Sequence, residues 1–158
     1  MLPELSPLPR YRACFVCGRD NPCGLRGIFK TDGERVYYEF VPQEHHVGYK
    51  SRIHGGVITA AMDEAMGWAI YVATGGRMFY TWELRVRFIK PVRPGQRLMV
   101  EAEPVGETRA CYLSRARLID DAGVVYARSE GKYVLIPESD AKEVLNYLDD
   151  EVDQPPES

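Results

Sequence analysis

Apolar and polar residues alternate in several stretches of this chain, most clearly from residue 79 to residue 89. In that stretch one face carries large apolar side chains and the other carries charged ones: Trp82, Leu84, Val86 and Phe88 against Glu83, Arg85 and Arg87. A period of two is typical of half-buried strands. On this pattern and on the turn sequences between stretches, strands are predicted at residues 26–30, 36–41, 79–89, 97–103, 110–119 and 124–136.

Residues 55–72 have a different pattern, since they are apolar nearly all round apart from Thr59, Asp63 and Glu64. This predicts a buried helix. A second, short helix is expected at residues 139–147, capped by Ser139. The predicted order is therefore two strands, one buried helix and then four antiparallel strands. This order is typical of an α+β protein in which an antiparallel sheet wraps around a helix.

The length of 158 residues fits one domain, expected at residues 13–148. Residues 1–12, rich in Pro and Leu, are predicted to be a flexible segment, and residues 149–158 an acidic disordered tail. The net charge of −3 gives no basic excess for a nucleic-acid partner. No apolar run of membrane-spanning length and no signal peptide is evident, so a cytoplasmic protein without a membrane partner is expected.

The buried helix is predicted to begin at His54-Gly55-Gly56. The first turn of a helix has free backbone N–H groups, and the helix dipole favours negative charge there. Two glycines let a ligand approach these groups closely. The segment is therefore an oxyanion hole in outline. His54 is expected either to fix the geometry of this loop or to contact a substrate.

Two carboxylates interrupt this helix. Asp63 shares its face with small or polar residues at helical intervals, Thr59, Gly56 and Gly67, whereas Glu64 lies about a hundred degrees round the axis. Asp63 is thus better placed to face a cleft. A buried carboxylate is costly unless it is paired, hydrogen-bonded or functional, so a structural role, binding a backbone group or an arginine across a subunit boundary, stays open beside a catalytic one.

Three of the four cysteines lie close together in the spacing C-x2-C-x5-C, namely Cys14, Cys17 and Cys23. Without a secretory signal a disulfide framework is not expected. One interpretation is a structural zinc site that takes its fourth ligand from His45, His46 or Cys111. The other is a turn-rich cap over a substrate cleft, in which the thiols are buried and bind no metal.

The segment from His54 to Gly67 resembles the HGG helix of hotdog-fold acyl-CoA thioesterases of the phenylacetate-pathway (PaaI-like) type. Three other segments are similar to parts of the same family: residues 14–25 (CFVCGRDNPCGL), residues 46–49 (HVGY) and residues 84–95 (LRVRFIKPVRPG). Together these segments cover most of the chain. The resemblance implies a hotdog fold, in which an antiparallel sheet wraps around one long helix.

The resemblance also implies a reaction, the hydrolysis of an acyl-CoA thioester to free acid and CoA without a cofactor. In the family, an acidic residue nine positions after the histidine acts as nucleophile or general base, and Asp63 occupies that position. A backbone N–H at Gly55 or Gly56 then polarises the thioester carbonyl. Thr81 matches a hydroxyl that positions water in some members, although alternation alone places it on the polar face of its strand.

Other expected contacts follow from the same resemblance. Several members have an asparagine at the position of Gly48, and His46 is expected to replace it in substrate binding. Glu64 is also expected to bind substrate. The acyl chain is expected near Met66, Trp68, Phe79 and Trp82, and the CoA phosphates near some of Arg52, Arg77, Arg85, Arg87 and Lys90.

A curved sheet around one helix has open edges, which two subunits can satisfy by pairing. A homodimer or homotetramer is therefore expected, and in the family the active site forms where two subunits meet. Two alternatives remain: a non-catalytic acyl-CoA binding module, and a hotdog hydratase or dehydratase acting on acyl thioesters.

Overall fold

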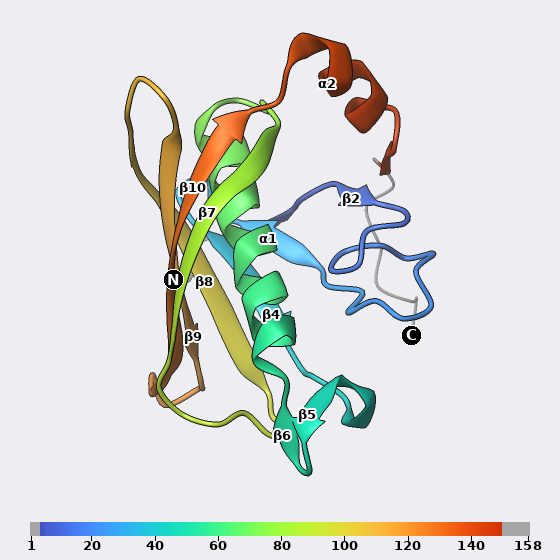
Figure 1. Ribbon diagram of the computed structural model, residues 1–158, viewed down its shortest axis with the longest axis vertical. Coiled ribbons are helices and arrows are strands. Elements are labelled where there is room, and N and C mark those ends of the chain that lie inside the picture. The colour runs from blue at the N-terminus through green and yellow to red at the C-terminus, as the bar shows by residue number, and fades with distance from the viewer. Residues whose placement is uncertain (1–3, 150–158) are drawn as a thin grey trace.

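The long helix α1 (Gly55–Ala73) packs against one face of an antiparallel sheet in the computed structural model, which describes residues 4–149 (Figure 1). On the other side of α1 lies the N-terminal part of the chain, including β2 (Arg10–Tyr11) and the segment that follows it. The helix is therefore enclosed by the sheet and by this segment, here called the cysteine loop (residues 12–28).

The sheet has seven strands in the order β1-β3-β4-β8-β9-β10-β7. Their bounds are β1 Ser6–Pro7, β3 Phe29–Thr31, β4 Val36–Phe40, β8 Leu98–Glu107, β9 Tyr112–Ile119, β10 Val125–Leu135 and β7 Phe79–Phe88. Strands β8, β9 and β10 form an antiparallel meander, whereas β7, the first of the four strands after the helix, pairs with the free side of β10. The hotdog-type α+β fold, with its sheet around one helix, is confirmed.

Smaller elements complete the fold. A 3-10 turn, η1 (Glu44–His46), leads into the hairpin of β5 (Val47–Tyr49) and β6 (Arg52–Ile53), which lies beside the first turn of α1 (Figure 1). The short helix α2 (Glu138–Leu145) begins one residue before the range predicted for it and ends two residues earlier, and β11 (Leu148–Asp149) pairs with β2.

The core lies between α1 and the concave face of the sheet. The helix contributes Met62, Met66 and Ile70, and the strands contribute Leu98 and Leu118, all almost completely buried. The helix ends at Thr74, and the two glycines that follow have positive φ angles, which glycine adopts without strain.

Strand β7 departs from the predicted alternation at one position. Its pairing with β10 shifts between Lys132 and Tyr133, so that Lys132 faces Glu83 and Tyr133 faces Thr81. Trp82 is the extra residue of a β-bulge. The Trp82 side chain therefore does not share the inward face of Leu84, Val86 and Phe88. The Thr81 side chain points inward instead. The expectation that Thr81 points to the polar face was wrong, because strict alternation does not pass through a bulge.

Parts of the two predicted terminal segments lie outside the described residues. Residues 1–3 and 150–158 are not described, and these include almost all of the predicted acidic tail. Within the segment predicted to be flexible, Ser6–Pro7 pairs with β3 and Arg10–Tyr11 pairs with β11. Among residues 4–149, no helix is long and apolar enough to cross a membrane.

Candidate active site

The carboxylate of Asp63 lies at the middle of α1, where two hydroxyl groups hold it. The Tyr133 hydroxyl donates to Oδ1 at 2.8 Å, and the Thr81 hydroxyl approaches Oδ1 at 3.0 Å and Oδ2 at 3.2 Å. Thr81 comes from β7 and Tyr133 from β10, on neighbouring positions across the sheet. The bulge at Trp82 is what brings Thr81 to this site.

Burial raises the pKa of Asp63 above its ordinary value, and the hydrogen bonds from Tyr133 and Thr81 oppose this rise. Burial and the neighbouring Asp63 also raise the pKa of the Tyr133 phenol, so that it stays protonated and acts as a donor. The site thus holds a desolvated carboxylate in a fixed orientation, which suits a nucleophile or a general base.

Tyr133 was not predicted as a site residue. Its ring is buried against α1 because Gly131, two residues before it on the same face, has no side chain. A Cβ at Gly131 would lie 2.5 Å from Tyr133 Cε2. A glycine two positions before an inward-facing tyrosine was the available signal, but only the fold shows that the hydroxyl reaches Asp63.

At the start of α1, His54 is the N-cap residue, and its Nδ1 accepts a hydrogen bond from the Gly56 N–H at 2.8 Å. This bond occupies the Gly56 donor and leaves the proton of a neutral imidazole on Nε2. The Gly55 N–H has no partner within the helix, because it lies at the first helical position. Of the two predicted oxyanion donors, Gly55 is therefore the one that a ligand can use.

Both glycines are also closely packed. A Cβ at Gly55 would lie 3.1 Å from the Phe88 ring, and one at Gly56 would lie 2.9 Å from His54 Nδ1. Gly48 packs closely against the same histidine, because a Cβ added at this position would lie 3.1 Å from His54 Cδ2. At Gly48, where the resemblance led us to compare an asparagine, there is thus little room for a side chain.

His46 is tied to His54 through its backbone, whose carbonyl accepts the His54 N–H at 2.9 Å. Its Nδ1 accepts the Gln43 N–H at 2.9 Å, and its buried Nε2 has no hydrogen-bond partner among the described residues. Burial lowers the pKa of His46. His46 and His54 therefore lie together beside the helix N-terminus, whereas His45 packs against the His46 ring.

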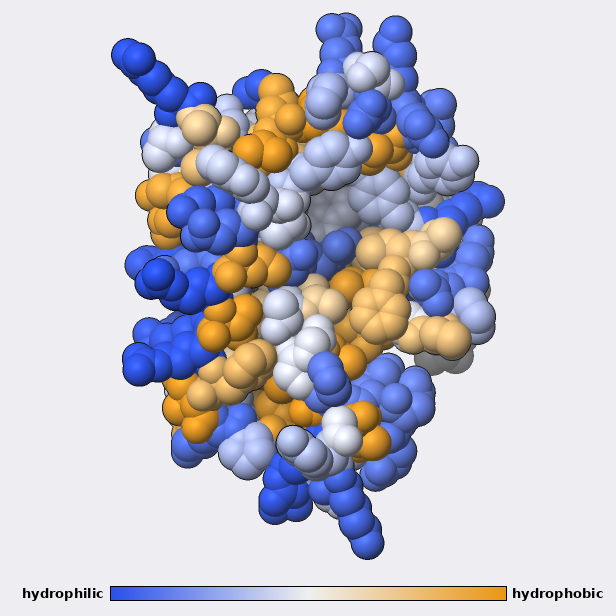
Figure 2. All heavy atoms as spheres, in the orientation of Figure 1, coloured by the Kyte–Doolittle hydropathy of each residue, from blue (hydrophilic) through white to orange (hydrophobic). Residues whose placement is uncertain are grey.

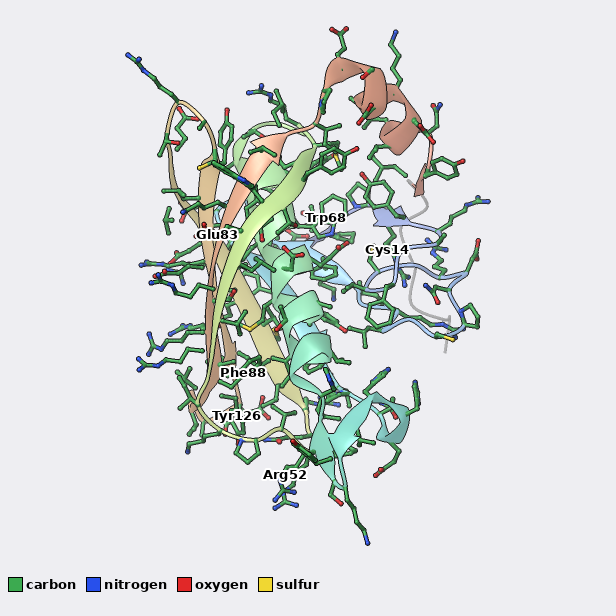
Figure 3. The ribbon with its side chains drawn as sticks, viewed as in Figure 1. Cys14, Arg52, Trp68, Glu83, Phe88 and Tyr126 are labelled. Carbon is green, nitrogen blue, oxygen red and sulfur yellow. The ribbon has the colours of Figure 1, made fainter. Side chains whose placement is uncertain are left out.

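A pocket of about 120 Å³ adjoins Asp63, and it is lined by both hydroxyl residues, Thr81 and Tyr133. Figure 2 shows a hollow in this face of the molecule, at the position that Trp68 occupies in Figure 3. Three of the predicted substrate contacts line the pocket: Glu64, Trp68 and Phe79. Three do not: His46 lies beside the N-terminus of α1, Met66 is fully buried in the core, and Trp82 is 60% exposed on the edge strand.

The cysteine loop meets α1 at Glu64. The Sγ atoms of Cys14 and Cys17 and a carboxylate oxygen of Glu64 all lie within 4.8 Å of one another. Cys23 is not in this group, and neither is any of the predicted fourth ligands. Burial raises the pKa of Glu64 to about 8, and a hydrogen bond with Cys17 lowers that of Cys14.

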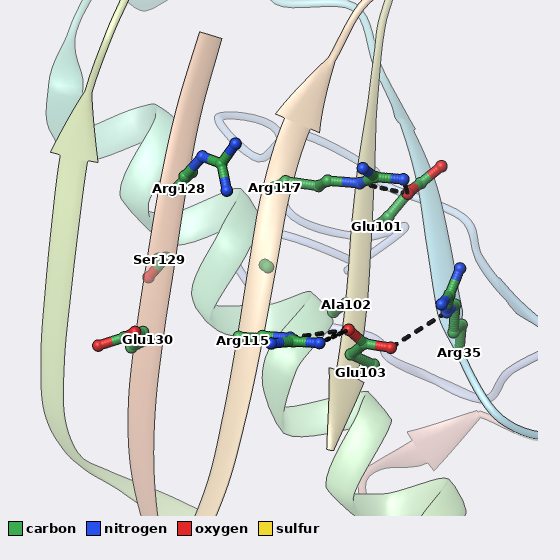
Figure 4. A pocket seen from close by; sticks show the side chains of 10 residues that line it. Arg35, Glu101, Ala102, Glu103, Arg115, Arg117, Arg128, Ser129 and Glu130 are labelled. Carbon is green, nitrogen blue, oxygen red and sulfur yellow. Dashed lines mark hydrogen bonds and ion pairs between the residues drawn. The ribbon is translucent and has the colours of Figure 1, made fainter. Parts of the chain in front are cut away.

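Three of the five predicted phosphate-binding cations lie in two separate places. Arg77 lines the pocket near Asp63. Arg85 and Arg87 lie opposite Glu130 and Arg128 on the outer face of the sheet, away from α1. That face has a depression of about 440 Å³ crossed by ion pairs such as Arg117–Glu101 and Arg115–Glu103 (Figure 4). It shares no residue with the Asp63 site.

Comparison with known proteins agrees with this fold. The family model of the thioesterase superfamily matches residues 51–127, which include α1 and most of the sheet. A comparison with curated proteins gives no match. Among solved structures, a thioesterase superfamily protein has a TM-score of 0.69 at 22% identity over 78% of this chain, and the match spans 60% of that protein.

Two further structures are similar. The PaaI protein of the E. coli phenylacetic acid degradation operon has a TM-score of 0.64 at 16% identity, with 72% of this chain and 81% of that chain covered. A hypothetical thioesterase from Streptococcus pneumoniae, solved with coenzyme A, has a TM-score of 0.59 at 16% identity, with 65% and 81% covered. The matched segment is just under half of the chain, and the expected resemblance to hotdog thioesterases of the PaaI type is confirmed in fold.

Proposed function

We propose that this protein hydrolyses acyl-CoA thioesters, with Asp63 as the nucleophile or general base. The observation that carries the proposal is the Asp63 carboxylate itself. It is desolvated, it is oriented by the hydroxyl groups of Tyr133 and Thr81, and both of these residues line a pocket. A carboxylate with only a structural role has no need of a pocket beside its two donors.

In the proposed reaction the thioester carbonyl carbon is attacked by Asp63 or by a water molecule that gives its proton to Asp63. Negative charge develops on the carbonyl oxygen, and the Gly55 N–H at the positive end of the α1 dipole stabilises it. The C–S bond then breaks and CoA leaves as the thiol after taking up a proton. Where Asp63 is the nucleophile, water hydrolyses the resulting anhydride and releases the acid.

The spacing of Gly55 and Asp63 supports a site shared by two chains. Asp63 follows Gly55 by eight residues on one helix, so the two are separated by ~12 Å along its axis at 1.5 Å per residue. A single carbonyl group cannot contact both. The proposal is therefore that Gly55 of one subunit and Asp63 of another act on the same thioester.

Strand β7 supports such an arrangement. Among residues 4–149 it is the last strand of the sheet, so one of its edges has no partner strand there and is available for pairing. Along it Trp82 and Phe88 are 60% and 53% exposed, which is unusual for large apolar side chains. Phe88 also packs on Gly55, which links this edge to the proposed oxyanion donor.

The walls of the pocket and a similar protein both support an acyl-CoA substrate. Trp68 and Phe79 give the pocket apolar walls that suit an acyl group. Its volume of about 120 Å³ is smaller than the ~300 Å³ at which ligand pockets generally begin, so a second chain is expected to enlarge it. CoA as the thiol carrier is supported by the similar S. pneumoniae protein solved with coenzyme A.

The test is thiol release from a panel of acyl-CoAs that spans short, long and aromatic acids. We expect turnover by the unmodified protein and a loss of about 10²- to 10⁴-fold in Asp63→Asn, which keeps the shape of the side chain but not its basicity. The matched control is Asp121→Asn, at an exposed turn position, which should retain full activity.

Full activity in Asp63→Asn would show that the carboxylate has no part in the reaction. Saturable acyl-CoA binding without any thiol release, in both the unmodified protein and the control, would instead identify a non-catalytic binding module.

A further inference from the structure

Two thiols and a carboxylate converge where the cysteine loop crosses α1. Cys14 and Cys17 come from the loop and Glu64 from the helix, and their ligand atoms lie within 4.8 Å of one another. The Cys14 thiol is 3.6 Å from Glu64 Oε1. In Figure 3 the loop that carries Cys14 faces the side of α1 that carries Trp68.

Backbone N–H groups are aimed at both sulfur atoms. The N–H groups of Val16 and Cys17 point to Cys14 Sγ at 3.3 and 3.4 Å, and that of Tyr11 points to Cys17 Sγ at 3.4 Å. Such bonds stabilise sulfur that carries negative charge, as a metal-bound thiolate does. The loop is built to hold this arrangement around Cys17.

The turn after Cys17 permits only glycine. A Cβ at Gly18 would lie 2.4 Å from the Cys14 carbonyl oxygen and 2.5 Å from the Arg12 carbonyl oxygen. The Gly18 N–H closes the turn by donating to the Cys14 carbonyl at 2.9 Å. The two thiols are therefore held on one side of a tight turn.

Glu64 is fixed in a similar way. The Trp68 indole N–H, one helical turn further along α1, donates to Glu64 Oε1 at 3.2 Å. Hydrogen bonds of this kind orient metal ligands. With all three ligands deprotonated, the group would carry three negative charges in a largely buried place, and a bound cation would balance them.

We propose that Cys14, Cys17 and Glu64 bind one Zn²⁺ ion, with water in the fourth position. Thiolate sulfur and carboxylate oxygen in a tetrahedral set are ligands that zinc accepts. Zn–S bonds of ~2.3 Å place neighbouring ligand atoms about 3.7 Å apart, so a small contraction of the observed group completes the site. Zinc binding releases the thiol protons to solvent.

The ion would fasten the cysteine loop to α1 beside the pocket. Tyr11, just before this loop, stacks on Trp68 with ring centroids 6.1 Å apart, and both side chains line the pocket. Zinc at Glu64 thus holds the pocket wall in place. The proposed role of the ion is structural, and it takes no part in the hydrolysis.

The test begins with the full chain purified without chelator and kept reduced. We expect about one zinc per chain by elemental analysis. Replacing the zinc with Co²⁺ should give the near-ultraviolet charge-transfer band of cobalt–thiolate bonds. Treatment with a chelator should lower the melting temperature of the unmodified protein.

The variants separate the ligand set from its surroundings. Cys14→Ser, Cys17→Ser and Glu64→Gln should lose the metal, whereas Cys23→Ser and Cys111→Ser should keep it. Glu64→Gln is the decisive variant, because glutamine can still accept the Trp68 hydrogen bond and so preserves the fold. Its melting temperature should not respond to chelator. Asp63→Asn should retain zinc, which makes this test independent of the proposed reaction.

Three results would overturn the proposal. The first is a reduced protein that binds neither zinc nor cobalt. The second is loss of metal from Cys23→Ser with retention in Glu64→Gln, which would make the three cysteines the ligands. The third is a Cys14–Cys17 disulfide in the purified protein, detected as two cysteines that resist alkylation until they are reduced, which would make the pair a redox site.

Discussion

Tyr133 gives the Asp63 carboxylate its shortest hydrogen bond, at 2.8 Å, from a phenol that burial keeps protonated. Burial and this bond act in opposite directions on the pKa of Asp63. The balance between them sets the pH at which the carboxylate becomes charged and can act as a nucleophile or base.

Removing the Tyr133 hydroxyl should therefore move the pH dependence of the reaction. Tyr133→Phe deletes a bond to the charged form of Asp63, which raises the pKa of that carboxyl further. The acid limb of the kcat/KM profile should shift to higher pH. The measurement is kcat/KM against pH for the best acyl-CoA.

The control is Tyr126→Phe, whose hydroxyl donates to Asp120 at 3.3 Å on another part of the sheet. Its profile should match that of the unmodified protein. An acid limb that stays in place in Tyr133→Phe would mean that a group other than Asp63 controls it.

At the scale of elements, two glycines of contrasting surroundings flank the Tyr133 ring. Gly131 on β10 has no room, since a Cβ would lie 2.5 Å from the ring, whereas a Cβ at Gly67 on α1 would make an ordinary contact at 3.9 Å. The two positions form a matched pair, because the same methyl group would be added on either side of one side chain.

Gly131→Ala should displace Tyr133, destabilise the protein by about 1–3 kcal/mol and reduce turnover. Gly67→Ala should stabilise it by up to about 1 kcal/mol, because alanine is the better helix residue. Urea unfolding of both variants measures these changes. Equal effects from the two substitutions would contradict the close packing at Gly131.

The elements themselves were largely predictable from the sequence. Five of the six predicted strands and the central helix follow from hydrophobic periodicity, because that pattern directly reflects which side of each element faces the core. The strand predicted at residues 26–30 begins only at Phe29. The short pairings at Ser6–Pro7, Arg10–Tyr11 and Val47–Tyr49 have no such pattern, since two or three residues do not show a period.

The site was predictable where its residues lie on one helix and not where they come together from several elements. Gly55 and Asp63 follow from the helix and from its resemblance to a family. The reorientation of Thr81 depends on a bulge that leaves no mark in the pattern of polar and apolar residues. Tyr133 and the contact of Cys14 with Glu64 depend on long-range packing, across 70 and 50 positions of the chain.

At the scale of the whole molecule, the distance of ~12 Å between Gly55 and Asp63 along α1 predicts that each active site takes these two residues from different subunits. Gly55→Pro should abolish the oxyanion donor with little damage to the fold. Proline is favoured at the first helical position, and His54 already has φ −62° and ψ 132°, as a residue before proline requires.

Gly55→Pro and Asp63→Asn should each be nearly inactive alone, yet their co-expression should restore activity. In a mixed dimer, one of the two sites combines the intact Gly55 of one chain with the intact Asp63 of the other. Random pairing should give about a quarter of normal activity. The measurement is thiol release per chain after co-expression of both variants.

Gly55→Ala is the control, because it adds a Cβ beside Phe88 but keeps the N–H, so it should retain most activity. Co-expressed variants that remain as inactive as each one alone would place the whole site within one chain.

The open edge of β7 also bears on how the protein must be handled. A ten-residue strand with one unpaired edge and exposed Trp82 and Phe88 is a template for any other extended chain. If a second subunit normally covers this edge, dilution or a substitution that weakens the pairing exposes it. Aggregation is then expected before unfolding, so loss of solubility would be the first sign of a damaged subunit contact.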